Sequence, residues 1–113
     1  MLGLQTGNPH AAQPQTSAES KALNHERFVF NSLAACRSAC SAGQPPFTGR
    51  ANTPKTCAED CGCIGEQLGA RISGDDLWQA FLAERGGASR TEAMKPLIPR
   101  MLMSYKACGF TVP

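Results

Sequence analysis

The chain has 113 residues, of which 11 are basic and 9 acidic, and its formal net charge is +2. This length fits one domain. The near balance of charge, without a run of Lys or Arg, argues against nucleic acid or an anionic membrane surface as a partner. The sequence lacks an apolar stretch long enough to span a bilayer. It also lacks a glycine-rich phosphate-binding motif.

The cysteine content indicates the compartment. Six cysteines are a high, even number for a chain of this size and favour disulfides in an oxidising environment. Residues 1–20 nevertheless lack the basic start and the apolar stretch of a signal peptide. We therefore predict a periplasmic or secreted protein whose signal peptide has been removed. The alternative is an intracellular protein whose thiols bind metal or stay reduced.

The N-terminal part predicts a tail followed by a helix. Residues 1–19 carry Gly, Pro and Gln without apolar periodicity, which predicts a flexible tail ahead of a single helical domain at 20–113. Apolar residues then recur at intervals of three and four from about Ser20 to Ala42, which predicts the first helix. Gly43 is a suitable C-terminal cap for it.

A loop and a second helix follow. Residues 43–56 contain three prolines and two glycines, which exclude regular structure. The second helix is predicted to begin at Thr56, because Thr56 and Glu59 match a capping box. It is predicted to end between Gly69 and Arg71.

The C-terminal part predicts two further helices. Ser73 and the acidic pair that follows Gly74 indicate the start of the third helix, and Gly86 ends it. Because Pro96 and Pro99 would break a helix interior, we predict a short turn at 90–95 and a last helix that runs from near Pro96 to Ala107. The predicted fold class is therefore all-α, a small four-helix domain.

The cysteine spacing predicts how the first two helices are joined. Cys36 and Cys40 lie one helical turn apart, and so do Cys57 and Cys61. In an antiparallel hairpin the inner residues pair with each other and the outer residues pair with each other. This geometry predicts one disulfide between Cys40 and Cys57 and another between Cys36 and Cys61.

Cys63 requires a different partner. It points about 200° away from Cys61 around a helix, and Cys108 is the remaining cysteine, so we predict a third disulfide at 63–108. The doubled Cys-x3-Cys pattern resembles the twin pattern of the small import chaperones of the mitochondrial intermembrane space, in which the pairs staple a helical hairpin. That resemblance supports the hairpin and does not extend to function.

Two other uses of the cysteines remain open. Four thiolates from the two pairs could bind one Zn²⁺, and Cys61-Gly-Cys63 could exchange disulfides. Acidic neighbours such as Glu59 and Asp60 oppose the thiolate that exchange requires. With two histidines and no evident nucleophile arrangement, we predict that the protein is not an enzyme and has no cofactor.

The loop 43–56 is the predicted binding site for a protein partner. A disulfide at its base and prolines within it would limit the entropy lost on binding. The alternative is a connector in which Phe47 folds back onto the core. The predicted contact residues are Gln44, Pro45, Pro46, Phe47, Thr48, Arg50 and Asn52.

The size, the cysteine layout with Cys61-Gly-Cys63 and the late Cys108, and the loop together resemble small exported bacterial proteins that are helical and disulfide-stapled. Some of these are periplasmic immunity proteins against peptidoglycan amidases delivered by type VI secretion. The resemblance implies an inhibitor that inserts the loop 43–56 into the active-site groove of such an amidase.

The alternative functions are a carrier of lipids or small apolar ligands, and a metal-binding or chaperone-like cysteine protein. For the carrier, a pocket within the helical bundle would be lined by Trp78, Phe81, Met94, Met101 and Met103. At helical spacing such residues are more often part of the core.

Overall fold

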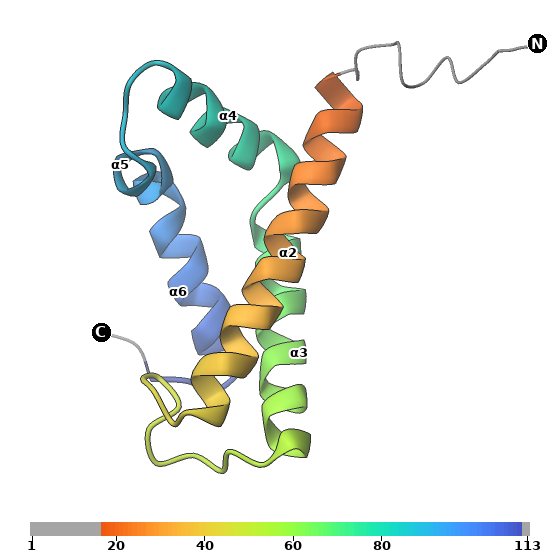
Figure 1. The fold of residues 1–113 in the computed structure, drawn as a ribbon, viewed down its shortest axis with the longest axis vertical. Coiled ribbons are helices and arrows are strands. Elements are labelled where there is room, and N and C mark those ends of the chain that lie inside the picture. The colour runs from red at the N-terminus through yellow and green to blue at the C-terminus, as the bar shows by residue number, and fades with distance from the viewer. Residues whose placement is uncertain (1–16, 112–113) are drawn as a thin grey trace, which may run out of the picture.

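The computed structural model describes residues 17–111, and this part of the chain is all-helical, as predicted (Figure 1). Residues 90–94, predicted as part of a short turn, form a short helix, and a 3-10 turn precedes the last helix, which begins at Ile98 and ends at Ala107 as predicted. The elements are α2 (Ser17–Ser41), α3 (Pro54–Arg71), α4 (Gly74–Arg85), α5 (Arg90–Met94), η1 (Lys95–Leu97) and α6 (Ile98–Ala107).

The three disulfides join the predicted pairs. Cys36–Cys61 and Cys40–Cys57 staple α2 to α3, each with a Cα–Cα distance of 5.7 Å. Cys63–Cys108, with a Cα–Cα distance of 6.0 Å, ties the end of α6 to α3. Since all six cysteines are used, the four thiolates of the zinc alternative are not available.

Two helix starts differ from the prediction. Helix α2 begins at Ser17, so residues 17–19 are helical, and residues 1–16 of the predicted tail lie outside the described part of the chain. Helix α3 begins at Pro54 and not at Thr56, and its cap is Thr53, whose hydroxyl accepts a bond from the Thr56 backbone N–H (3.2 Å). Proline suits this first helical position because it has no N–H to leave unpaired.

The predicted boundaries of α4 and the predicted end of α6 agree with the structure. Ser73 and Asp76 form a capping box at the start of α4, which ends at Arg85 before the predicted glycine. Ser89 caps α5 by accepting a bond from the Glu92 backbone N–H (3.1 Å). After α6 the chain turns at Gly109, whose φ of 85° is in the left-handed region that favours glycine.

The helices form an open V (Figure 1). Helices α2 and α3 lie antiparallel side by side, and α6 packs against α3. Helix α4 leaves the upper end of α3 and packs against the N-terminal half of α2. As a result, α2 and α6 diverge from the disulfide-linked end toward α4.

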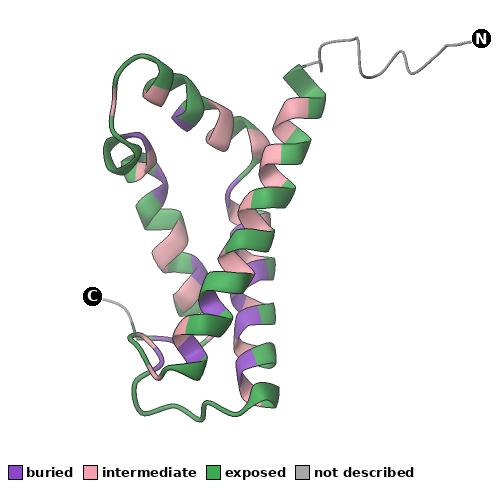
Figure 2. Ribbon diagram, in the orientation of Figure 1, coloured by how far each residue is buried: buried purple, intermediate pink, exposed green. Residues whose placement is uncertain are grey.

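The core lies at the disulfide-linked end and along α3 (Figure 2). Helix α4 contributes one buried residue, Ala80, so the upper end of the V is held mainly by partly buried contacts. The buried cluster consists of Cys36, Cys40, Phe47, Cys57, Cys61, Ile64, Leu68, Ile72, Leu97 and Phe110.

The position of α4 depends on a close backbone approach at its first residue. A Cβ atom at Gly74 would lie 2.7 Å from the carbonyl oxygen of Lys21 in α2. Because that oxygen belongs to a helix backbone, it cannot move away as a flexible side chain could. Gly62 in α3, by contrast, has nothing within 4 Å of the same built atom.

We expect Gly74→Ala to lower the free energy of unfolding by about 1–3 kcal/mol, because α4 must shift away from α2. The matched change Gly62→Ala should raise it by about 0.5–1 kcal/mol, since alanine is the better helix former in open space. Urea unfolding under non-reducing conditions, followed by circular dichroism, measures both values. Equal effects of the two substitutions would contradict the close packing at Gly74.

Asp76 links the start of α4 to α6. Its carboxylate accepts bonds from the backbone N–H of Ser73 (2.8 Å) and from the Ser73 hydroxyl (3.0 Å), and it pairs with the Arg100 guanidinium. The Ser73 backbone bond is the main reason that the pKa of Asp76 is below its ordinary value of 3.8, and Arg100 adds to the effect. The fold therefore favours the charged carboxylate.

Because the folded-state pKa of Asp76 is lowered, its stabilising contribution is present above about pH 4 and is lost as the pH falls through the lowered value. We expect Asp76→Asn to reduce stability near neutral pH and to weaken the decline of stability below about pH 4. Asp75→Asn, at a side chain that is 75% exposed, is the matched control and should change little. Urea unfolding at a series of pH values measures the free energy of unfolding of each variant. Identical pH profiles for wild type and Asp76→Asn would contradict the prediction.

Candidate functional site

The loop 43–56 is held at both ends and along its length. The Cys40–Cys57 disulfide joins the helices that it connects. Within it, the backbone N–H of Phe47 donates to the Gln44 carbonyl (2.7 Å) and that of Arg50 to the Phe47 carbonyl (2.9 Å). Farther along, the Asn52 amide donates to the Ser41 carbonyl (3.3 Å). The loop is therefore an ordered turn structure fixed to α2 and α3.

Phe47 is the anchor of this loop. Its side chain is 1% exposed and its ring packs edge-on against that of Phe110, with 5.2 Å between the ring centroids. The ring of Tyr105 also packs edge-on against that of Phe110, with 5.9 Å between the ring centroids. Burial raises the pKa of Tyr105, so the phenol stays uncharged within this aromatic cluster.

Arg50 covers the cluster from outside. Its guanidinium carbon lies 3.9 Å from the centroid of the Phe110 ring, a cation–π contact. The same guanidinium donates to both carboxylate oxygens of Asp60 in α3, at 3.1 and 3.4 Å. One side chain thus joins the loop, the C-terminal segment and α3.

The structure separates the predicted contact residues into two groups. Phe47 follows the connector alternative, because it folds back onto the core and is not presented to a partner. Pro46 is half-buried. The exposed residues are Gln44, Pro45, Thr48, Arg50 and Asn52. Whether they contact a partner stays a prediction.

The sequence did not indicate that Phe110 and Asp60 would support the loop. Phe110 comes from the far end of the chain, and Asp60 is one of several acidic residues in α3. A signal for Phe110 did exist, since an apolar residue directly after a capping glycine usually packs back onto its helix. Nothing in the spacing indicated that the loop would lie against it.

A second candidate site is the groove between α2 and α6, here called the α2–α6 groove. Its upper section, beside α4 and α5, is a depression of about 610 Å³ that opens to solvent, and its lower section, beside the loop 43–56, is one of about 280 Å³. The sections share the side chains of Phe28, Ser32, Ala35 and Met101, so they form one continuous depression.

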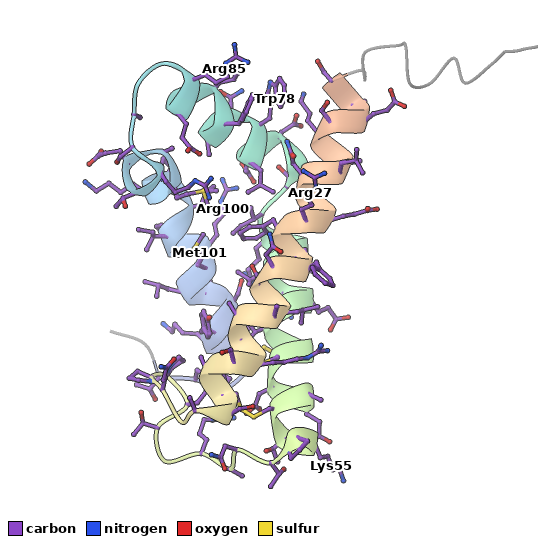
Figure 3. All side chains as sticks on the ribbon, in the orientation of Figure 1. Arg27, Lys55, Trp78, Arg85, Arg100 and Met101 are labelled. Atoms are coloured by element: carbon purple, nitrogen blue, oxygen red, sulfur yellow. A yellow bond between two sulfur atoms is a disulfide. The ribbon has the colours of Figure 1, made fainter. Side chains whose placement is uncertain are left out.

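Of the five residues predicted to line a carrier pocket, three meet in the upper section of this groove: Phe81, Met94 and Met101. Trp78 lies in an adjoining depression, with 5.2 Å between its ring centroid and that of Phe81. Met103 is 50% exposed and lies elsewhere, beside Arg71 and Pro99. Figure 3 shows Arg27 and Trp78 near the junction of α2 and α4, and Met101 on α6.

Three further observations concern metal ligands, membrane spans and export. Within residues 17–111, no three His, Cys, Asp or Glu side chains gather as metal ligands would. In the same range, no helix combines the length and the apolar character that crossing a membrane requires. Three disulfides in a chain of this size are compatible with an exported protein.

Comparison of the chain with protein-family models, with curated proteins and with solved structures gave no match. The geometry of the loop and of the groove is therefore the basis for the functional proposals below.

We expect Phe47→Ala to lower the free energy of unfolding by about 3–5 kcal/mol, because it leaves a cavity against Phe110. Phe30→Ala is the matched control. Phe30 is 71% exposed on α2, so its removal should change stability by less than about 0.5 kcal/mol. Chemical denaturation measures both variants, and a small loss for Phe47→Ala would show that the loop is not anchored by this ring.

Proposed function

We propose that this protein binds another exported protein through the loop 43–56 and inhibits it. The observation that carries the proposal is the order imposed on the loop by three independent attachments. These are the Cys40–Cys57 disulfide, the buried ring of Phe47, and the Arg50 guanidinium on Asp60 and Phe110. A segment already fixed in its bound shape loses little conformational entropy on binding.

The outer surface of the loop has the character of a protein contact. Gln44, Thr48 and Asn52 are exposed and offer side-chain donors and acceptors. Pro45 adds rigid apolar area between them. The burial of Phe47 changes its predicted role, because the ring supports the contact surface from below and does not enter the partner.

The segment 43–56, which includes the first turn of α3, contains two cations and no anion. Arg50 is paired with Asp60, whereas Lys55, at the foot of α3 in Figure 3, makes no ion pair or side-chain hydrogen bond within residues 17–111. A polar or moderately acidic cleft on the partner would complement this surface, since charge complementarity guides association and orientation.

The loop inhibits the partner by occupying its active-site cleft. A disulfide-clamped loop keeps its shape when it enters a cleft, because the disulfide prevents it from collapsing or extending. The resemblance to periplasmic immunity proteins makes a peptidoglycan amidase delivered into the periplasm the first partner to test. Residues of the loop would then block the amidase groove without chemistry of their own.

We expect Gln44→Ala to weaken binding to such an amidase about tenfold or more, because it removes hydrogen bonds at the centre of the contact. Gln79→Ala is the matched control, since Gln79 is also exposed but lies on α4, away from the loop. Titration calorimetry and amidase inhibition measure the two effects. Equal affinity of both variants would place the contact away from the loop.

A second variant tests the order of the loop. Replacing Cys40 and Cys57 together by serine opens the clamp and leaves Cys36–Cys61 to hold α2 on α3. We expect weaker binding with retained helical content, because the loop must then be ordered on association. Unchanged inhibition by this variant would contradict the proposed role of preorganisation.

A further inference from the structure

The α2–α6 groove has a surface that the proposed inhibitor function does not use. One face of α2 forms its wall, because Asn24, Phe28, Ala35 and Ala39 recur at helical spacing along it. From Asn24 to Ala39 this wall is about 22 Å long at 1.5 Å per residue. Met101 on α6 faces both sections from the opposite wall.

Each end of the groove meets a different element. Leu77, Ala80 and Phe81 of α4 line the upper end, and Phe81 also lines the adjoining depression beside Trp78. Pro45, Pro46 and Phe47 of the loop line the lower end. The upper section alone, at about 610 Å³, is of the size of small-molecule sites.

The lining of the upper section combines apolar side chains with the polar side chains of Asn24, Asn31 and Ser32 and with a net positive charge. Phe81, Met94 and Met101 supply apolar surface, and methionine adapts to chains of different shape. Three charged residues line the upper section. Arg90 is paired with Glu84 (3.1 Å), whereas Arg27 makes no ion pair or side-chain hydrogen bond within the described residues.

We infer that the α2–α6 groove binds a long-chain carboxylate, with the acyl chain along α2 and the carboxylate on the guanidinium of Arg27. An acyl chain matches the length and the apolar part of the walls. A carboxylate matches the unpaired guanidinium, which can donate two parallel hydrogen bonds to it. Pro45 belongs both to the lower end of this groove and to the proposed contact surface of the loop, whereas Arg27 and the upper section lie away from the loop.

The first experiment is calorimetric titration of the full chain with fatty acids of increasing length, below the concentrations at which they form micelles. From octanoate to dodecanoate, affinity should rise about fourfold for each added methylene, because each one is buried in the groove. The fluorescence of Trp78, the single tryptophan, reports the same event, since it lies beside Phe81. Absence of saturable binding would overturn the inference.

Two ligands with the same chain test the role of charge. Dodecanol and dodecyltrimethylammonium should bind at least about tenfold more weakly than dodecanoate, because neither forms the charged pair with Arg27. Equal affinity for the cation would show unspecific adsorption on apolar surface and would overturn the proposed site.

Arg27→Gln should weaken dodecanoate binding about tenfold and leave dodecanol binding unchanged. The matched control is Arg37→Gln, on the same helix but outside the groove, which should change neither. A loss of dodecanol affinity equal to that of dodecanoate would mean that Arg27 acts only by shaping the groove, which contradicts its assignment as the carboxylate ligand.

Ala35→Phe should abolish binding, because Ala35 lies where the two sections join. Ala34→Phe, at the neighbouring exposed position outside the groove, is the control and should bind as wild type. Intact mass and circular dichroism verify that both variants keep their disulfides and helices.

Amide NMR of the wild-type chain tests the location without any substitution. Dodecanoate should shift the signals of Ala35, Ala80 and Met101 and leave those of Gly62 and Glu66 on the outer face of α3 unchanged. Shifts confined to other surfaces would overturn the assignment. A second outcome would also overturn it. If a designed acidic amphipathic helix shifts the groove signals and fatty acids do not, the groove binds peptides.

Discussion

The two disulfides between α2 and α3 are the constraint on which the rest of the structure depends. They fix two adjacent turns of one helix against two adjacent turns of the other, which sets both the antiparallel direction and the register. Closing loops of this length stabilises a fold by about 3 kcal/mol each on the chain-entropy model. This matters in a molecule whose buried cluster is small and lies mainly along α3.

The third disulfide attaches the C-terminal segment to the hairpin and fixes its position. By holding Cys108 on α3, it brings Phe110 under the loop, where the ring contacts Phe47 and accepts the guanidinium of Arg50. The loop is therefore supported by a residue far away in the sequence. The upper end of the V has no comparable staple, and α4 is positioned by the approach at Gly74 and by the pair of Asp76 with Arg100.

This division of the molecule produces two surfaces of different kinds. At the stapled end, a rigid polar loop suits recognition of a protein, because little entropy is lost when it binds. Between the diverging helices, a groove with methionine and phenylalanine walls suits an apolar chain. Both contain residues that the sequence had marked, Gln44 and Thr48 in the loop and Met94 and Met101 in the groove.

The sequence by itself determined the all-α class, the three disulfide pairs and most helix ends, because helical spacing, caps and prolines act over a few residues. It misplaced the start of α3, where Thr53 caps the helix and Pro54 is its first residue, and it predicted a turn where the short helix α5 lies. Tertiary structure alone decided that Phe47 is buried, that Asp60 and Phe110 hold Arg50, and that Met103 lies apart from Met101. These facts depend on contacts between distant segments, whose geometry no local pattern encodes.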